Sequence, residues 1–401
     1  MGDRIRKWIA VLLAGSILAM IQLVPAGGAV FVRENIENKE ILGEKETSLQ
    51  QTLHARAWVL MDADSGRILA GKDADTAYPM ASTTKILTCI LALEQGNPDG
   101  WVEVSEKAAS MPDVQLNMRA GERYRLSDLL YSLMLESHND SAVAVAEHIG
   151  GSVEEFAEKM NRKAREIGCK NVCFVTPNGL DVADADGNEH SASAADMARI
   201  MRYCAFQSPC RETFLEITRT ASRTIQDESG NRSFYLANHN ALLSQCAEVL
   251  SGKTGFTGKA GYCYVAALKK EGKAFTVALL GCGWPPHKTY KWADMRKLDQ
   301  YAFDTYNWYD IFDREKTFPE VEVRRGVKGT TALTLNLPSE KQMFLMLLRA
   351  DEKPDIRPSW KHRFMKDRRS GRHPIILMTS RWLLIRSMRQ KQWRRLIMGG
   401  V

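Results

Sequence analysis

Strand-forming segments lie at both ends of a helical stretch in this sequence, and that order limits the folds that the chain can adopt. Residues 55–75 contain two β-rich runs around the turn Asp62–Gly66. After residue 245, three further apolar runs follow one another, separated by segments rich in glycine and lysine. Strands at both ends of a chain with helices inserted between them are typical of an antiparallel sheet with segregated helices. The sequence therefore predicts an α+β fold.

Helical periodicity fills the chain between these strand segments. The polar stretch Glu136–Asp140 interrupts an otherwise apolar pattern and divides it into two helices. We expect helices at 83–93, at 123–150 on either side of that stretch, at 153–167, at 191–206 and at 290–307. Ser191 or Ser193 is expected to cap the helix at 191–206, because a serine hydroxyl accepts from the free N–H groups of a first helical turn.

Length and composition exclude several classes of protein. A chain of 401 residues with 44% hydrophobic and 26% charged residues can bury a core in two domains and a third small one. It is not a disordered chain, a collagen-like fibre or a polytopic membrane protein. The net charge of +7 is located at one end, since residues 353–401 hold 14 Lys and Arg against 2 Asp and Glu. The preceding residues are mildly acidic, so no nucleic-acid binding is expected of the main domain.

Residues 1–29 have the features of a secretory signal peptide. A basic segment ending at Lys7 precedes an apolar run of 17 residues at 8–24, and small residues offer a cleavage site after Ala29. The run is also nearly long enough to span a bilayer, so an uncleaved anchor is the alternative. Both place the rest of the chain outside the cytoplasm, at the outer face of the membrane or secreted. Residues 30–52 are polar and are expected to form a spacer.

The eight cysteines leave two redox states open. Short loops could be closed by Cys169 with Cys173 and by Cys204 with Cys210. In a domain of this size, mostly reduced thiols are an equally reasonable expectation. Cys89 and Cys263 fall within apolar runs and are expected to be buried. Since no C-x-x-C and no zinc-finger spacing of histidines occurs, we expect no metal site.

The first motif with chemical content is Ser82–Thr83–Thr84–Lys85, at the expected start of a helix. Taken alone, Ser82 could be a helix cap and Lys85 a solvated residue. The residues on both sides are apolar, however, so this turn is expected to be buried. Three residues of helix place Lys85 on the same face as Ser82. A desolvated lysine can lose its proton and act as a base toward the serine hydroxyl.

Two further short motifs follow. Ser137–His138–Asn139 lies at the break between two helices, where the polar triplet is expected to be exposed. A second S-x-N, Ser229–Gly230–Asn231, lies in a polar stretch and is expected to be an ordinary turn. Lys253–Thr254–Gly255 begins the C-terminal strand section. It could be a surface hairpin, or an exposed edge strand that offers a cation, a hydroxyl and a close-approach glycine to an extended peptide with a carboxylate end.

The three motifs S-x-x-K, S-x-N and K-T-G occur here in the order found in penicillin-binding proteins and serine β-lactamases. With ARAWVLMDADSGRILAGKDAD, FVTPNGLD, His190–Ser191 and SGKTGFTGKAGYCYVAAL, the chain resembles the D-alanyl-D-alanine carboxypeptidases, low-molecular-mass penicillin-binding proteins of the serine peptidase class. The resemblance implies a catalytic domain at 53–315 with a β-lactamase/transpeptidase-like fold. In that fold an antiparallel sheet is flanked by helices, and the active site lies between the sheet and a helical lobe.

The resemblance also implies roles for individual residues. Ser82 would be the acylating nucleophile and Lys85 its base, while Ser137 and Asn139 would complete the proton relay and hold the substrate amide. On the K-T-G strand, Lys253 and Thr254 would bind the terminal carboxylate beside Gly255, and the N–H groups of Ser82 and Phe256 would form the oxyanion hole. The implied substrates are peptidoglycan stem peptides, the implied inhibitors are β-lactams, and no cofactor is implied.

Two alternatives remain at this stage. A class A β-lactamase would carry a Glu followed four residues later by Asn, and no such pair occurs between Ser137 and Lys253. His138 also stands where those enzymes usually have Asp. A catalytically idle cell-wall binding protein on the same fold would have no need of a paired Ser82 and Lys85. All three observations favour the peptidase, while β-lactamases of classes C and D are not tested by the first two.

The C-terminal part departs from the family pattern. Residues 318–356 are expected to begin a small β domain, with strands near 320–325, 331–336 and 343–349. Residues 357–401 form an atypical basic tail whose apolar residues follow neither the strand nor the helix period. The tail is either a frameshift product or a cationic element that makes peripheral contact with anionic lipid.

Overall fold

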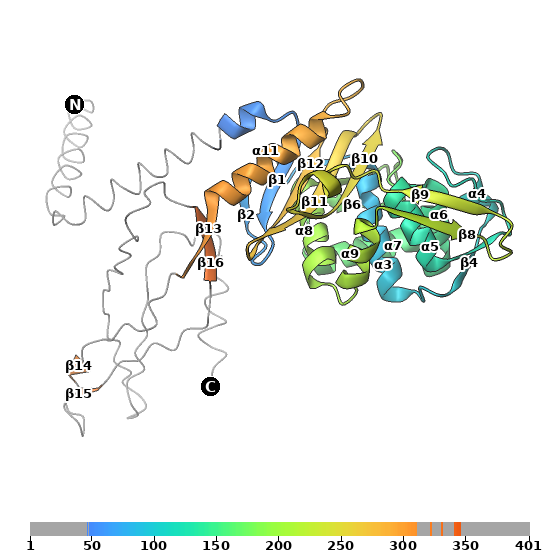
Figure 1. The fold of residues 1–401 in the computed structure, drawn as a ribbon, viewed down its shortest axis with the longest axis horizontal. Helices are drawn as coiled ribbons and strands as arrows, with labels where there is room; N and C mark the ends of the chain where they lie inside the picture. Colours follow the sequence, from blue (N-terminus) through green and yellow to red (C-terminus); the bar gives the residue numbers. More distant parts are fainter. Residues whose placement is uncertain (1–45, 47, 311–320, 323–329, 332–340, 346–401) are drawn as a thin grey trace, which may run out of the picture. The chain divides into compact units, whose positions relative to one another are not determined.

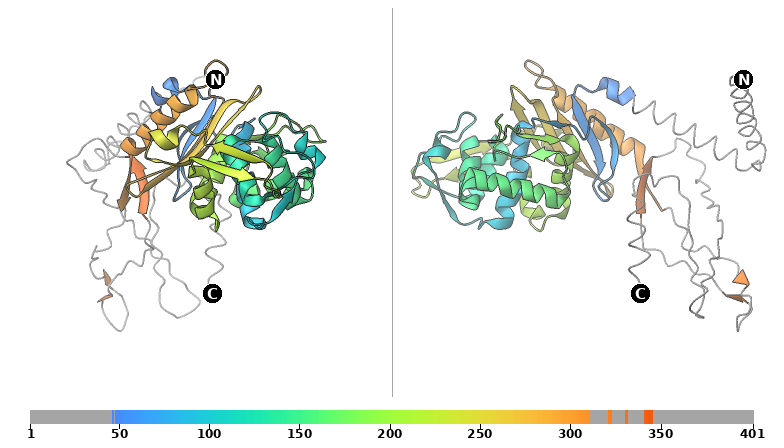
Figure 2. Two further views of the ribbon diagram at one scale, coloured as in Figure 1. Left: turned by 45° about the vertical axis from the view of Figure 1, so that its right-hand side comes forward. Right: turned by 180° about the vertical axis from the view of Figure 1, so that it is seen from behind.

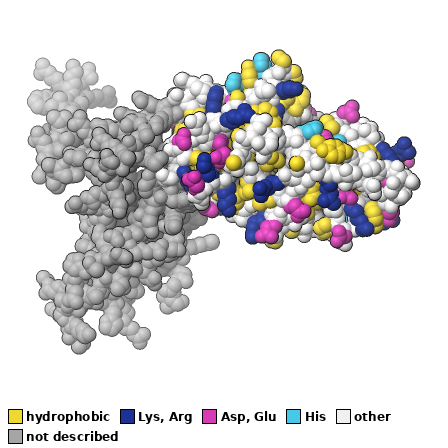
Figure 3. Space-filling view, in the orientation of Figure 1, with side chains coloured by type: hydrophobic (Ala, Val, Ile, Leu, Met, Phe, Trp, Pro, Cys, Tyr) yellow, Lys and Arg dark blue, Asp and Glu magenta, His cyan; other side chains and the backbone are white. Residues whose placement is uncertain are grey.

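The computed structural model describes residues 46, 48–310, 321–322, 330–331 and 341–345 (Figure 1). The expected signal peptide, most of the spacer and the basic tail at 357–401 lie outside the described residues. Within the described part of the chain, no helix is both long and apolar enough to cross a membrane. On the face shown in Figure 3, acidic and basic side chains are interspersed rather than gathered by sign.

The centre of the molecule is a five-stranded antiparallel sheet with the order β10-β11-β12-β1-β2. Its strands are β1 (Ala57–Asp62), β2 (Ile68–Lys72), β10 (Val249–Thr257), β11 (Gly261–Lys270) and β12 (Lys273–Leu280). The register places Ala57 opposite Leu280 and Asp62 opposite Phe275. Strands from the two ends of the sequence therefore form one sheet, which confirms the predicted α+β fold.

Both faces of this sheet are covered, and β1 shows why. All six of its residues are buried. Because successive side chains of a strand point to opposite faces, Val59 and Met61 belong to the core shared with the helical lobe, whereas Trp58 and Leu60 belong to the core on the other face. Helix α8 (Ala194–Arg202) packs on β1 and β12 on the first side. Helix α11 (Tyr290–Thr305) packs on β11 and β12 on the second (Figure 2).

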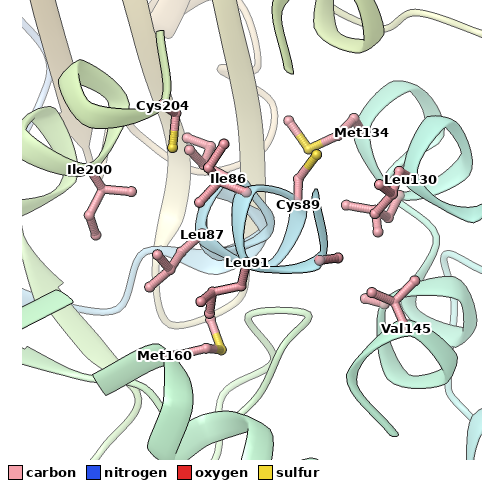
Figure 4. Close-up of a cluster of buried hydrophobic side chains, with 14 of the residues drawn as sticks. Ile86, Leu87, Cys89, Leu91, Leu130, Met134, Val145, Met160, Ile200 and Cys204 are labelled. Atoms are coloured by element: carbon pink, nitrogen blue, oxygen red, sulfur yellow. The ribbon is translucent and has the colours of Figure 1, made fainter. Parts of the chain in front are cut away.

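The helical lobe is built around α3 (Lys85–Gln95), which follows the 3-10 turn Ala81–Thr84. Nine of its eleven residues are buried, because other helices surround it on all sides. Figure 4 shows Ile86, Leu87 and Leu91 of α3 among side chains from neighbouring helices. Those neighbours include α5 (Leu126–Tyr131), α6 (Asn139–Gly150), α7 (Val153–Ile167), α9 (Arg211–Arg219) and the π turns Ser132–Glu136 and Tyr203–Gln207. The remaining short helices are α4 (Glu106–Ala109) and α10 (Leu242–Gln245).

Short strand pairs complete the described fold. They comprise β3 (Ala77–Tyr78), β6 (Val172–Cys173) and β7 (Ser191–Ser193) in one three-stranded sheet, and the ribbons β4 (Trp101–Glu103) with β5 (Arg123–Arg125) and β8 (Ser222–Gln226) with β9 (Ser233–Ala237). Toward the C-terminus, β13 (Tyr306–Asp310) pairs with β16 (Lys341–Leu345), and β14 (Val321–Glu322) pairs with β15 (Thr330–Thr331). The rest of the expected β domain at 318–356 lies outside the described residues.

Two expectations from the sequence need adjustment, and the redox state of the cysteines, which the sequence left open, can be assigned. The helix expected at 191–206 begins at Ala194, because Ser193 is its N-cap and accepts from the Asp196 N–H at 3.1 Å, which leaves the preceding residues to form β7. The end of the spacer is helical at 48–52, since Leu49 packs against the sheet core. All eight cysteines are free thiols, and Cys89 and Cys263 are buried as expected.

Candidate active site

The three motifs meet where the helical lobe adjoins the edge strand β10. Ser82 lies in the 3-10 turn before α3, Ser137 follows the π turn Ser132–Glu136, and Lys253 lies on β10. The Lys85 amine is 2.9 Å from Ser82 Oγ, as the shared helical face predicts, and Lys253 Nζ is 3.0 Å from Ser137 Oγ. Residues separated by more than 100 positions thus form a single cluster.

The Lys85 side chain is completely buried and has three polar partners. Its Nζ lies 2.9 Å from Ser82 Oγ, 2.9 Å from Asn139 Oδ1 and 2.7 Å from the backbone oxygen of Asn178. Burial lowers the pKa of Lys85 well below its usual range, and the neighbouring Lys253 lowers it further. The carboxylate of Asp140 acts in the opposite direction but is the smallest of these influences. The site therefore favours a neutral amine at Lys85.

The partners of Lys85 determine where its lone pair points. A neutral amine has two N–H groups and one lone pair. The Asn178 carbonyl only accepts. The amide oxygen of Asn139 also accepts, because its Nδ2 donates to the carbonyls of Pro112 and Asp113 at 3.1 and 3.2 Å. These two oxygens take both N–H groups, so the lone pair is directed at the Ser82 hydroxyl.

The S-x-N triplet is less exposed than the sequence suggested. Asn139 is 4% exposed and His138 is 8% exposed, whereas Ser137 is partly exposed. The reason is that each buried side chain has partners inside the lobe: His138 Nδ1 lies 2.8 Å from Ser132 Oγ, and Asn139 contacts Lys85. Only Ser137, with a left-handed φ of 70°, is presented toward β10. Ser229–Gly230–Asn231 forms the turn between β8 and β9, as expected.

Lys253 is a second buried lysine in the site. It is 2% exposed, and its Nζ donates to Ser137 Oγ and to the Thr254 carbonyl, both at 3.0 Å. Burial lowers the pKa of Lys253 to about 7. No carboxylate pairs with it among the described residues, so its charge is available to an anionic ligand. Thr254 is partly exposed beside it on the edge strand.

Gly255 has a different neighbour from the one expected. A Cβ at this position would lie 2.9 Å from the Ser82 nitrogen and 3.0 Å from the Thr83 nitrogen. The close approach that requires glycine is therefore between β10 and the nucleophile turn. The next residue, Phe256, is 43% exposed and stacks at a tilt on Tyr262, with ring centroids 4.6 Å apart.

The Asn178 carbonyl was not identified from the sequence. It belongs to the segment FVTPNGLD, which contributes to the family resemblance as a whole. A backbone oxygen has no residue-type signature, but the glycine that follows it gives an indirect signal. Gly179 has a φ of 89°, and any Cβ there would overlap the Ala81 carbonyl. Among the described residues, no group of three or more His, Cys, Asp or Glu is arranged to hold a metal ion.

This arrangement defines a class of enzyme. A serine hydroxyl facing the lone pair of a buried amine can be deprotonated for nucleophilic attack, and a cationic edge strand beside it can hold an anionic peptide end. Together with a mixed sheet-and-helix fold, these features are those of serine acyl-transfer enzymes of the penicillin-binding type.

The chain belongs to the peptidase S11 family of D-alanyl-D-alanine carboxypeptidases, whose family model matches residues 44–282. D-alanyl-D-alanine carboxypeptidase DacF of Bacillus subtilis is 31% identical over 335 residues, which cover 81% of this chain and 79% of that protein. A crystal structure of D-alanyl-D-alanine carboxypeptidase from Mycobacterium tuberculosis matches with a TM-score of 0.56 and 29% identity, over 62% of this chain and 91% of that one.

A third comparison concerns ligand binding. Penicillin-binding protein D2 of Listeria monocytogenes, solved in an ampicillin-bound form, matches with a TM-score of 0.54 and 25% identity, over 63% of this chain and 98% of that one. The family and the fold agree with the resemblance recognised from the motifs. They favour a serine carboxypeptidase over the two alternatives, a β-lactamase and an idle binding protein.

Proposed function

We propose that this protein removes the terminal D-alanine from peptidoglycan stem peptides through an acyl-enzyme on Ser82. The observation that carries the proposal is the contact of 2.9 Å between Ser82 Oγ and a Lys85 amine whose two N–H groups are already engaged. The names of the relatives supply the substrate class.

The proposed reaction has two steps. Ser82 transfers its proton to Lys85 and attacks the carbonyl of the penultimate D-alanine, and the resulting ester forms as the peptide bond breaks. The leaving amine takes a proton, and free D-alanine departs. Water then attacks the ester, one proton passes back to Ser82, and the shortened peptide is released. Lys85 can serve as the base in both steps because its environment favours the neutral form.

The second lysine explains the preference for a terminal carboxylate. Lys253 carries a charge with no acidic partner among the described residues, and it lies beside the Thr254 hydroxyl on an edge strand. A peptide that ends in a carboxylate can pair with β10 and place that carboxylate against both groups. Ser137 lies between this charge and the lobe, and we assign it the transfer of a proton toward the leaving amine. Asn139 orients Lys85 alone, because its Oδ1 accepts from Lys85 and its Nδ2 is engaged by the carbonyls of Pro112 and Asp113.

The oxyanion of the tetrahedral intermediate needs donors from two elements. We assign these to the N–H groups of Ser82 and Phe256. The close packing of Gly255 against the Ser82 turn supports this assignment, because it brings the backbone of β10 next to the Ser82 nitrogen. One such donor is worth about 10²–10³-fold in rate.

Two further statements extend the proposal. A β-lactam is a strained amide with a nearby carboxylate, so it is expected to acylate Ser82; the ampicillin-bound Listeria relative supports this. Action on peptidoglycan requires export, and the signal-like residues 1–29 support an extracytoplasmic location.

The test is covalent labelling with a fluorescent penicillin. Wild-type protein should be labelled and should release D-alanine from diacetyl-Lys-D-Ala-D-Ala, whereas Ser82→Ala should do neither while its thermal unfolding is unchanged. Ser229→Ala, in the second S-x-N motif, is the matched control and should behave as wild type. Labelling of the Ser82→Ala variant at another residue would show that the nucleophile is misassigned.

A further inference from the structure

His190 is a buried histidine that the proposed reaction does not use. It precedes β7 and is 3% exposed. Its Nδ1 faces two backbone donors, the N–H groups of Val175 at 2.9 Å and Thr176 at 3.3 Å. An imidazole nitrogen that accepts from N–H groups carries no proton. The proton is therefore on Nε2, which donates to Thr84 Oγ1 at 2.8 Å.

The Thr84 hydroxyl passes this restraint to the nucleophile turn. Having accepted from His190, it donates to the Ala81 carbonyl at 2.8 Å. Ala81, the residue before Ser82, has a left-handed φ of 50°, which a residue with a side chain rarely adopts without support. The hydrogen bond from Thr84 fixes its carbonyl on one side, and the close approach of Gly179 confines it on the other.

The same histidine restrains the segment that orients the base. It holds Val175 and Thr176 at the start of the segment 175–179. At the other end, Thr88 of α3 donates to the Pro177 carbonyl at 2.7 Å, and Lys85 donates to the Asn178 carbonyl at 2.7 Å. His190 is thus hydrogen-bonded on one ring nitrogen to the segment that carries the Asn178 oxygen and on the other to the turn that carries Ser82.

We propose that His190 is a positioning residue for acylation: through Thr84 it holds the Ser82 turn in register with the Asn178 carbonyl, so that the Lys85 lone pair points at the Ser82 hydroxyl. This inference rests on the proposed function of Ser82 and Lys85. His190 touches none of the reacting atoms. If the turn and the segment shift relative to each other, an N–H of Lys85 loses its acceptor and is free to turn toward Ser82 in place of the lone pair.

The protonation state of His190 suits a fixed role. Burial lowers its pKa to about 3, and the nearby Lys85 contributes in the same direction. The imidazole is therefore neutral at neutral pH, with its proton on Nε2. The groups around it are the edge-on ring of Phe174, at a centroid distance of 5.8 Å, and the hydrogen-bond partners already named.

The test separates positioning from stability by measuring acylation of intact protein. Thr84→Val keeps the shape of the side chain but removes the hydroxyl, and Thr84→Ser is the matched control that keeps it. With a fluorescent penicillin at saturating concentration, Thr84→Val should lower the first-order acylation rate constant by up to about 100-fold. The non-covalent dissociation constant should stay constant, because the carboxylate site on β10 is untouched. Thr84→Ser should acylate at nearly the wild-type rate.

Substitutions of His190 give the second arm. The variant His190→Gln places an amide N–H near the position of the histidine Nε2 and should retain much of the acylation rate. Asn can accept from Val175 but does not reach Thr84, and it should lose as much as Thr84→Val. The double variant with His190→Asn and Thr84→Val should be no slower than either single variant, because both break one linkage.

The outcome that overturns the proposal is clear. If Thr84→Val is fully folded at the assay temperature and its acylation rate constant lies within about twofold of wild type, His190 contributes only to stability. That result differs from a failure of the proposed function, which would appear in the wild-type protein and in Ser82→Ala. A rise in the non-covalent dissociation constant with an unchanged acylation rate constant would equally refute a role in positioning the nucleophile.

Discussion

Lys253 offers the most informative single perturbation, because it is expected to act on the substrate and on Lys85 at once. We consider Lys253→Met, which keeps an unbranched apolar stem in a position that is 2% exposed. The substitution removes the hydrogen bond of 3.0 Å to Ser137 together with the charge. Lys259→Met is the matched control, since Lys259 is an exposed lysine just beyond β10 that pairs with Glu189.

The expected effect of Lys253→Met on kcat/KM has two parts. Loss of one charge-assisted hydrogen bond to the substrate carboxylate costs about 1.5–3 kcal/mol, which corresponds to roughly 10- to 150-fold in kcat/KM. The second part concerns Lys85, whose pKa is lowered by the Lys253 charge. Without that charge the pKa of Lys85 rises. Acylation needs the neutral amine, so the acidic limb of the pH profile should move to higher pH.

The alkaline limb of the pH profile tests carboxylate binding by Lys253 independently. Lys253 binds a carboxylate only while it is protonated, and burial lowers its pKa to about 7. In the free wild-type enzyme, kcat/KM should therefore decline as the pH rises through about 7. Lys253→Met has no such group, so its profile should lack this decline.

The assay is the second-order rate constant of acylation by a penicillin between pH 5 and 10, with release of D-alanine from a peptide as a parallel measurement. Lys259→Met should follow the wild-type profile. Two results would contradict these roles of Lys253: an alkaline limb that persists near neutrality in Lys253→Met, or an acidic limb that stays where it is in the wild type. The first result would mean that Lys253 does not bind the carboxylate through its charge, and the second that Lys253 does not influence the pKa of Lys85.

Two more predictions concern packing and pH-dependent stability. Gly255→Ala places a Cβ 2.9 Å from the Ser82 nitrogen, so labelling kinetics should show penicillin acylation slowed by roughly tenfold or more. Gly258→Ala, where a Cβ has open space, should not slow acylation. The pKa of His190 is lowered from 6.5 to about 3 on folding, so the unfolded chain binds the proton first and stability is lost as the pH falls below 6.5. This group should make the free energy of unfolding about 2 kcal/mol lower at pH 5 than at pH 8. In denaturant titrations, the difference between the two pH values should be smaller by that amount in His190→Gln than in the wild type.

Much of the fold could be predicted because it follows from local patterns. The strand runs at both ends of the sequence and the helix at 153–167 were recognised from periodicity alone, and the structure has α7 at Val153–Ile167. The Ser82–Lys85 contact could be predicted because a separation of three residues in a helical turn places two side chains on one face. Such inferences need no knowledge of the rest of the chain.

Other features depend on tertiary contacts and could not be inferred in the same way. The last residues of the expected spacer are helical because Leu49 and Leu53 pack on the sheet core, which no local pattern reveals. Asn139 is buried because Lys85, 54 residues away, needs an acceptor. The Asn178 carbonyl and the link from His190 to Thr84 involve a backbone oxygen and a pairing across 106 residues, neither of which has a residue-type signature.

The sheet topology has a consequence for when the enzyme becomes active. β1 has β12 as its neighbour, and Ala57 pairs with Leu280, so the partner strand emerges more than 200 residues later. At about 5–20 residues per second of synthesis, on the order of 10–45 s pass between the synthesis of β1 and that of β12. The helices between the two ends are synthesised in that interval and can begin to pack on one another. β10, which carries Lys253 and Gly255, joins the same late event. Penicillin labelling during biogenesis should therefore mark only chains in which β1 has paired with β12. The onset of labelling would then report when the sheet is completed.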